Sequence, residues 1–200
     1  MSSLFLDTLS GRQSEKRPIW LMRQAGRYLA EYRAVRASES DFISFCLNPE
    51  KAVEVPLQPI NRFGFDAAII FSDILMVPWA LDRNVRFVTG EGPKLDPMET
   101  GGEITEAMIA GMTLRLTPVA TAISNCRAAL AADKALIGFA GAPWTIITYL
   151  LEGGSSRDFA TARRWMWEND VRFDRLLDLV SQATSDFLVL QAEAGADALM

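Results

Sequence analysis

Three short apolar runs constrain the fold of this 200-residue chain more than any other feature. They lie within residues 66–73, 135–141 and 196–200. Continuous apolar runs of this length are typical of strands buried on both faces. Because the segments between the runs have helical periodicity, the sequence predicts an α/β fold with a parallel sheet built from βα units.

Helix signals fill the gaps between the apolar runs. Asn48 and Pro49 predict the start of a helix that continues to about Phe63 and ends at Gly64, with a kink at Pro56. Its predicted apolar face is made of Val53, Leu57 and Ile60. Two further helices are expected, one beginning at Thr117 and Pro118 and including Ala120, Ile123 and Leu130, the other over about 171–194. The apolar spacing of the last one includes Leu176, Leu177, Val180, Ala183, Phe187, Leu188 and Gln191.

The third apolar run has only begun when the sequence stops at Met200. A parallel strand in mid-course is a poor place for a chain end, and three strands would leave two open edges. A complete (βα)₈ barrel needs about 250 residues. We therefore expect residues 1–200 to be a single domain truncated at its C-terminus, and inactive on its own.

The composition excludes several classes of site. Without histidine, the chain has no Ser-His-Asp triad, no Cys-His pair and no His-ligated metal. Cys46 and Cys126 lie too far apart in sequence for a zinc site, and two free thiols fit a reducing cytoplasm. The longest uncharged run, residues 135–151, is shorter than the ~20 residues of a membrane span, and no targeting segment is visible. The sequence predicts a cytoplasmic protein without a membrane partner.

Basic side chains are concentrated at the N-terminus. Residues 1–36 contain seven basic and three acidic side chains, whereas the whole chain has a net charge of −5. Six of the seven are arginines, whose planar guanidinium suits bidentate binding of carboxylate or phosphate. A local basic patch on an acidic protein favours a small anionic ligand over nucleic acid.

The densest part of this patch is residues 18–33, which include Arg23, Arg27 and Arg33 around Gly26. One interpretation is a ligand site in which the missing Cβ of Gly26 lets backbone approach the ligand. The alternative is an amphipathic helix with a solvated basic face. In a helix, arginines four residues apart would repel each other by about 0.2–0.5 kcal/mol, a cost that a bound polyanion would offset.

Asp73 follows the first apolar run and is the second candidate. In parallel α/β folds, ligands bind at the carboxyl ends of the strands. Capping of the following turn explains an aspartate at this position equally well. No second carboxylate forms an obvious pair with it, so a glycosidase-type acid pair is not indicated.

The third candidate segment is residues 138–149, where small residues follow the second run and Pro143 opens a helix. Such a turn is able to bind phosphate. The segment has no Gly-x-Gly-x-x-Gly and no Gly-Lys-Ser/Thr motif, so tight strand–helix packing explains the small residues better.

These three segments together resemble the uroporphyrinogen decarboxylase family. The resemblance is carried by Pro18-Ile-Trp-Leu-Met-Arg-Gln-Ala-Gly-Arg-Tyr28, Phe71-Ser-Asp-Ile-Leu75 and Gly138-Phe-Ala-Gly-Ala-Pro-Trp-Thr145, and extends through essentially the whole chain. One departure is Ala30, where the family pattern has proline; a proline would stiffen the turn, and its loss removes no functional group.

The resemblance implies a (βα)₈ barrel, a homodimer and a decarboxylase with no metal and no organic cofactor. The implied substrate is uroporphyrinogen, a cyclic tetrapyrrole whose four acetates lose CO₂. Asp73, Arg23 and Arg27 are the implied catalytic residues. The implied substrate-binding set adds five residues, Gln24, Ala25, Gly26, Arg36 and Tyr149, to these three. The family's remaining site residues, a Ser/Thr and a His, would lie beyond Met200.

Two alternatives remain open from the sequence. One is a related barrel, a corrinoid- or methionine-synthase-type methyltransferase, whose Cys and His metal ligands would lie mostly beyond residue 200. The Arg23-Gln-Ala-Gly-Arg27 segment argues against it. The other is a tetrapyrrole-binding protein without catalytic activity.

Overall fold

The computed structural model describes residues 3–98, 104–168 and 170–200 and divides the chain into two compact units. The first unit contains residues up to Ser72, Thr117–Phe139 and Leu188–Met200. The second contains Asp73–Leu116 and Ala140–Phe187. Each unit is thus assembled from separate stretches of sequence. The expected single domain stays a prediction.

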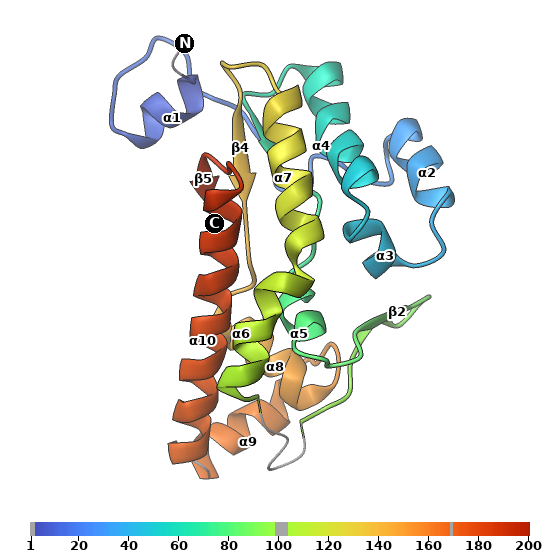
Figure 1. The fold of residues 1–200 in the computed structure, drawn as a ribbon, viewed down its shortest axis with the longest axis vertical. Coiled ribbons are helices and arrows are strands. Elements are labelled where there is room, and N and C mark those ends of the chain that lie inside the picture. Colours follow the sequence, from blue (N-terminus) through green and yellow to red (C-terminus); the bar gives the residue numbers. More distant parts are fainter. Residues whose placement is uncertain (1–2, 99–103, 169) are drawn as a thin grey trace. The chain divides into compact units, whose positions relative to one another are not determined.

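A parallel sheet forms the centre of the first unit (Figure 1). Its strands are β1 (Ala67–Ile69), β4 (Ala135–Gly138) and β5 (Ala198–Leu199), in the order β1-β4-β5. Ala67 pairs with Ala135 and Ile137 with Ala198, both in parallel register. The three apolar runs therefore form the predicted strands, and the predicted α/β class with parallel βα units is confirmed.

Helix α4 (Pro49–Phe63) begins and ends where the sequence predicts. The Asn48 side chain accepts from the Lys51 N–H at 3.3 Å, Pro49 occupies the first turn, and Gly64 ends the helix at φ 71°. The predicted apolar face is wrong, however. Its buried stripe consists of Ala52, Val55, Pro56, Gln58 and Pro59, whereas Val53, Leu57 and Ile60 are half-buried. The prolines therefore lie on the buried face of the helix.

Helix α7 (Thr117–Ala129) packs beside α4 in the first unit (Figure 1). Its Arg127 donates to Asp197 at 2.5 Å, and the same Asp197 carboxylate accepts from the Leu136 N–H at 2.7 Å. Asp197 also donates its own N–H to the Leu136 carbonyl at 2.8 Å. The hydrogen bonds with Leu136 fasten the start of β5 to β4, and the ion pair with Arg127 joins it to α7. Helix α1 (Leu4–Leu9) contributes Phe5 to the core under the sheet.

The long helix expected over about 171–194 is α10 (Asp170–Glu193). Its Gln191 is fully buried, and its side-chain amide exchanges two hydrogen bonds of 2.9 Å with the backbone of Phe139. A polar residue on the buried stripe is thereby satisfied at the end of β4. Leu177 and Leu188, predicted on this stripe, are only half-buried.

The second unit contains several elements that the apolar pattern did not predict. They are α5 (Met76–Ala80), the hairpin strands β2 (Arg86–Val88) and β3 (Gly92–Lys94), α6 (Glu106–Arg115) and α9 (Ala160–Glu168). Helix α8 (Pro143–Glu152) begins at Pro143 as predicted. In the described ranges, no single helix has the length and apolarity of a membrane span, although α6 and α7 pass that test as a bent pair.

Candidate active site

Residues 18–21 have no regular secondary structure and residues 22–29 form turns and bends, so the helical interpretation of the arginine segment is wrong for this part. The helix that follows, α2 (Ala30–Ala37), carries only Arg33 and Arg36. Arg23 has φ 59°, a left-handed conformation that is uncommon for a residue other than glycine. Arg23 and Arg27 are therefore not one turn apart on a helix, and the helical repulsion expected between them does not apply.

Gln24 fixes this loop from inside the protein. It is 2 % exposed, its amide donates to the Ala67 carbonyl at 2.9 Å, and its side-chain oxygen accepts from the Leu21 N–H at 3.1 Å. The Tyr28 hydroxyl donates to the backbone carbonyl of Gln24. Because both ends of the Gln24 amide form hydrogen bonds within the chain, its side chain ties the loop to β1. Its role in substrate binding stays a prediction.

Arg33 holds the other side of the loop. Its guanidinium donates to the carbonyl of Arg27 at 2.7 Å and to that of Tyr28 at 3.2 Å. Arg23 and Arg27 themselves are exposed, and the described part of the chain gives their guanidinium groups no hydrogen bond or ion pair. Arg33 thus holds the backbone of the loop, whereas the charges of Arg23 and Arg27 are accessible to an anion.

Ala25 and Gly26 complete the predicted loop. Ala25 packs against a core cluster of Leu29, Tyr32, Phe45 and Val55. A Cβ added to Gly26 would lie 3.5 Å from the Tyr28 ring, which is ordinary contact, and its φ is not in the left-handed region. The protein itself therefore gives no steric reason for glycine here, and the close approach of a ligand to the backbone at Gly26 stays a prediction.

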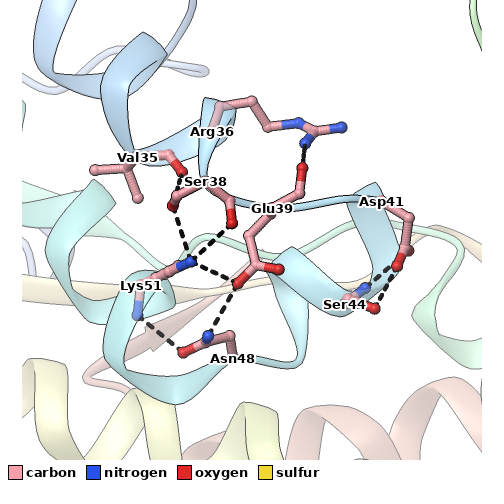
Figure 2. A network of polar contacts seen from close by, with 8 residues as sticks. All are labelled: Val35, Arg36, Ser38, Glu39, Asp41, Ser44, Asn48 and Lys51. Carbon is pink, nitrogen blue, oxygen red and sulfur yellow. Dashed lines mark hydrogen bonds and ion pairs between the residues drawn. The ribbon is translucent and has the colours of Figure 1, made fainter.

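Arg36 lies at the end of α2, where its guanidinium donates to the carbonyl of Glu39 at 2.8 Å (Figure 2). The guanidinium carbon is 5.8 Å from the centre of the Phe45 ring. Burial raises the pKa of the neighbouring Tyr32, and the charges of Arg36 and Arg27 oppose that shift. Arg36 is half-buried, unlike the arginines of the loop.

Asp73 lies in the second unit, beyond the end of β1. Its carboxylate accepts from the Leu75 N–H at 2.8 Å, and its carbonyl accepts from the Met76 N–H at 3.2 Å. The turn-capping interpretation is therefore confirmed. The cap uses one carboxylate oxygen of a half-buried side chain, so it does not exclude a role for the charge. The catalytic role stays a prediction.

Tyr149, on α8, lines a pocket of about 210 Å³ in the second unit. Hydroxyl-bearing and aromatic side chains surround this pocket. They are Trp144, Thr145, Thr148, Ser155, Ser156 and Phe159, with Gly154. Such a lining offers neutral hydrogen-bond donors beside apolar walls, which suits an organic ligand with a polar substituent.

The glycines before α8 are explained by packing. A Cβ on Gly138 would lie 2.7 Å from the Gln191 side-chain oxygen, and one on Gly141 would lie 3.1 Å from both Ile74 and Ile146. The packing interpretation of this segment is confirmed. The two neighbourhoods belong to different units, since Gly138 lies in the first and Gly141 in the second.

Both cysteines are buried, and neither forms a disulfide in the described residues. Burial raises the pKa of the Cys126 thiol to about 12, so it is protonated at neutral pH and is a poor nucleophile. In the described residues there is no group of three or more acidic, Cys or His side chains placed to hold a metal ion. The expected absence of a cofactor stays a prediction.

The predicted residues are divided between the two units. Arg23, Gln24, Ala25, Gly26, Arg27 and Arg36 belong to the first unit, and Asp73 and Tyr149 belong to the second. That the two groups act in one site stays a prediction. Sequence reasoning missed Glu39 and Lys51, which contact each other beside Arg36 (Figure 2). No sequence signal marks this pair, because its members are twelve positions apart and on different elements.

Comparison with known proteins identifies relatives of this chain. The family model described as uroporphyrinogen decarboxylase matches residues 1–200. The uroporphyrinogen decarboxylases of Rhodospirillum rubrum and Caulobacter vibrioides are 48 % and 53 % identical to the chain over 195 and 196 residues. Both alignments cover 98 % of this chain, which spans 56 % and 55 % of the length of these relatives.

A solved structure also has this fold. A methyltransferase from Methanosarcina mazei has a TM-score of 0.75 and 18 % identity, over 100 % of this chain and 58 % of its own. At that identity the likeness shows the fold alone. The family is shown instead by the match over all 200 residues, and the chain therefore belongs to the uroporphyrinogen decarboxylase family.

Proposed function

We propose that this chain is the N-terminal part of a uroporphyrinogen decarboxylase. The full-length protein would remove CO₂ from the four acetates of uroporphyrinogen III and give coproporphyrinogen III, a step of haem biosynthesis. The observation that carries the proposal is the loop at residues 21–29, where Gln24 and Arg33 fix the backbone and leave Arg23 and Arg27 exposed. Relatives with this activity in their names are about half identical to the chain.

In this proposal, Arg23, Arg27 and Arg36 bind substrate carboxylates. Arginine is suited to this role because its guanidinium donates two parallel hydrogen bonds to one carboxylate. Backbone at Ala25 and Gly26 lines the same wall. Tyr149 donates a hydrogen bond near the reacting acetate, from the hydroxyl-rich pocket on α8.

The reaction needs no added electron sink. Protonation of a pyrrole carbon makes the ring cationic, the bond to the acetate carboxylate then breaks, and its electron pair returns to the ring as CO₂ leaves. Protonation of the exocyclic methylene carbon and loss of the first proton from the ring carbon then leave a methyl group on a neutral pyrrole, so that one proton replaces each CO₂. Asp73 would lie beside the pyrrole N–H groups and stabilise the cation as it develops. One of Arg23 and Arg27 would help to deliver the proton.

The same proposal extends to the assembly. The strands β1, β4 and β5 would belong to a (βα)₈ barrel, whose remaining strands follow Met200, and the full-length enzyme would be a cytoplasmic homodimer. It would act without metal, organic cofactor, nucleic acid or membrane. Parallel barrels carry their sites at the carboxyl ends of the strands. Asp73 follows the carboxyl end of β1, which supports a role for it in the site.

The test is an assay of CO₂ release from uroporphyrinogen by the full-length protein, together with its zinc content. The proposal predicts stepwise loss of four CO₂ and no stoichiometric zinc. Bound stoichiometric zinc with methyl transfer would favour the related methyltransferases instead. Tight binding of uroporphyrinogen without CO₂ release would identify a tetrapyrrole-binding protein.

A further inference from the structure

A polar network locks the loop between α2 and α3 (Phe42–Cys46) onto the first turn of α4 (Figure 2). The Lys51 ammonium forms an ion pair of 2.8 Å with the Glu39 carboxylate and donates to the Ser38 hydroxyl at 2.8 Å. The Asn48 side chain donates to the same Glu39 oxygen at 3.0 Å. Lys51 and Asn48 thus hold residues 38 and 39 from the side of α4.

This ion pair is more enclosed than the Arg62–Glu31 pair, which also involves α4. The side chains of Lys51 and Glu39 are 27 % and 14 % exposed, whereas those of the Arg62–Glu31 pair are 54 % and 34 % exposed. Hydrogen bonding to Lys51 and Asn48 lowers the pKa of Glu39, so the carboxylate is charged at neutral pH. Because enclosed charges are screened less by salt and water, the geometry of this pair is better defined than that of a surface pair.

The network ends at Arg36, a predicted substrate-binding residue. Glu39, whose side chain is held by Lys51, presents its backbone carbonyl to the Arg36 guanidinium at 2.8 Å. That contact occupies one of the five N–H donors of the guanidinium. The Phe45 ring, 5.8 Å away, limits where the rest of the group lies. The remaining donors are left for a ligand.

We propose that Lys51 and Glu39 are positioning residues for Arg36. The ion pair fixes the Glu39 carbonyl, and the carbonyl fixes the guanidinium in the orientation that binds a substrate carboxylate. Neither residue touches the substrate. This inference rests on the proposed function, because it takes Arg36 as a substrate-binding residue.

The test is Lys51→Met in the full-length protein, which removes the ammonium and keeps an unbranched side chain. Because the change loosens a binding group and leaves the reacting atoms alone, KM for uroporphyrinogen should rise about three- to tenfold while kcat stays within about twofold. The matched control is Glu31→Ala, which breaks the ion pair between Glu31 on α2 and Arg62 on α4 and should leave both constants unchanged. An unchanged KM in Lys51→Met would overturn the proposal.

A double-mutant cycle separates positioning from a general structural role. In an Arg36→Ala background, Lys51→Met should have no further effect on KM, because the group that it positions is gone. If Lys51→Met raises KM equally in both backgrounds, the network acts on the site by another route and the proposal is wrong. If Lys51→Met does not fold, Glu39→Gln replaces it in the same cycle and is judged by the same criterion.

The cycle also distinguishes this inference from the proposed function. If the full-length protein releases no CO₂ and binds uroporphyrinogen, the proposed function fails, and the cycle is read from the dissociation constant of uroporphyrinogen instead of KM. A three- to tenfold weaker affinity in Lys51→Met that vanishes with Arg36→Ala supports positioning of Arg36 as a carboxylate ligand. Absence of any binding overturns both.

Discussion

The loop at residues 21–29 and helix α2 contain two arginines each, and the structure uses them differently. Arg33 and Arg36, on the helix, donate to backbone carbonyls. Arg23 and Arg27, in the loop, are exposed without such partners in the described residues. Residues of one type in one short segment thus differ in whether their guanidinium groups bond to the protein's own backbone. A charge pattern alone does not make this distinction.

The largest expected effect comes from Asp73, which is a turn cap and a proposed catalytic charge at once. Asp73→Asn keeps an oxygen that accepts from the Leu75 N–H, so the cap survives, but it removes the charge. Two unit charges about 4 Å apart attract by about 4 kcal/mol at an effective dielectric constant of 20. If about 3 kcal/mol of this acts on the cationic intermediate, single-turnover decarboxylation slows by a hundredfold or more.

The measurement is rapid-quench single turnover in the full-length protein, with substrate affinity and thermal stability measured alongside. The proposal expects a modest loss of affinity and unchanged stability. Lost affinity with an intact chemical step would make Asp73 an anchor for the macrocycle. If neither changes, Asp73 resembles Arg33 and serves only the fold.

A smaller effect is expected from paired conservative changes in the two regions. Arg27→Lys keeps the charge but loses the two-pronged contact, and a charged hydrogen bond contributes about 1.5–3 kcal/mol. We expect kcat/KM to fall roughly tenfold to a hundredfold. Arg33→Lys still donates to a carbonyl and should cost at most about threefold. Steady-state kinetics measure kcat/KM for both variants. Equal losses of kcat/KM would contradict the proposed difference between Arg27 in the loop and Arg33 on the helix.

The smallest effect on catalysis is expected at Gln24, whose buried side chain ties the loop to β1. Gln24→Met fills similar space but leaves the Leu21 N–H and the Ala67 carbonyl without this partner. Unsatisfied buried groups cost about 1–3 kcal/mol each, so the free energy of unfolding should fall by about 2 kcal/mol. Urea denaturation measures it. Unchanged stability with a large loss of affinity would show that Gln24 binds substrate directly.

The sequence predicted the parallel strands and the bounds of α4 and α10, because these depend on local signals. Asn48, Pro49 and Gly64 act within a few residues of the helix ends. The loop at residues 21–29 was not predicted, because Gln24 bonds to Ala67, 43 positions later. The buried face of α4 was misassigned because neighbouring elements, not residue type, decide which side of a helix is covered.

The candidate site residues were assigned from residue type and motif and stay predictions, whereas residues that hold them in place were missed. Arg23, Arg27 and Asp73 were identified from their motifs, whereas the partners Arg33, Glu39 and Lys51 act through backbone carbonyls or ion pairs. Such contacts leave no spacing pattern in the sequence. They become visible only when the turns that join the elements are known.

The central claim is that Arg23 and Arg27 bind the substrate whereas Arg33 holds the backbone. Its most direct test is arginine modification by phenylglyoxal, read by peptide mass spectrometry. It is carried out on the full-length protein with and without excess uroporphyrinogen. At substrate ten times above its dissociation constant, modification of Arg23 and Arg27 should slow about tenfold, because only about a tenth of the sites are free. Modification of Arg33 should not change. Protection of Arg33 with Arg23 and Arg27 unaffected would contradict the account.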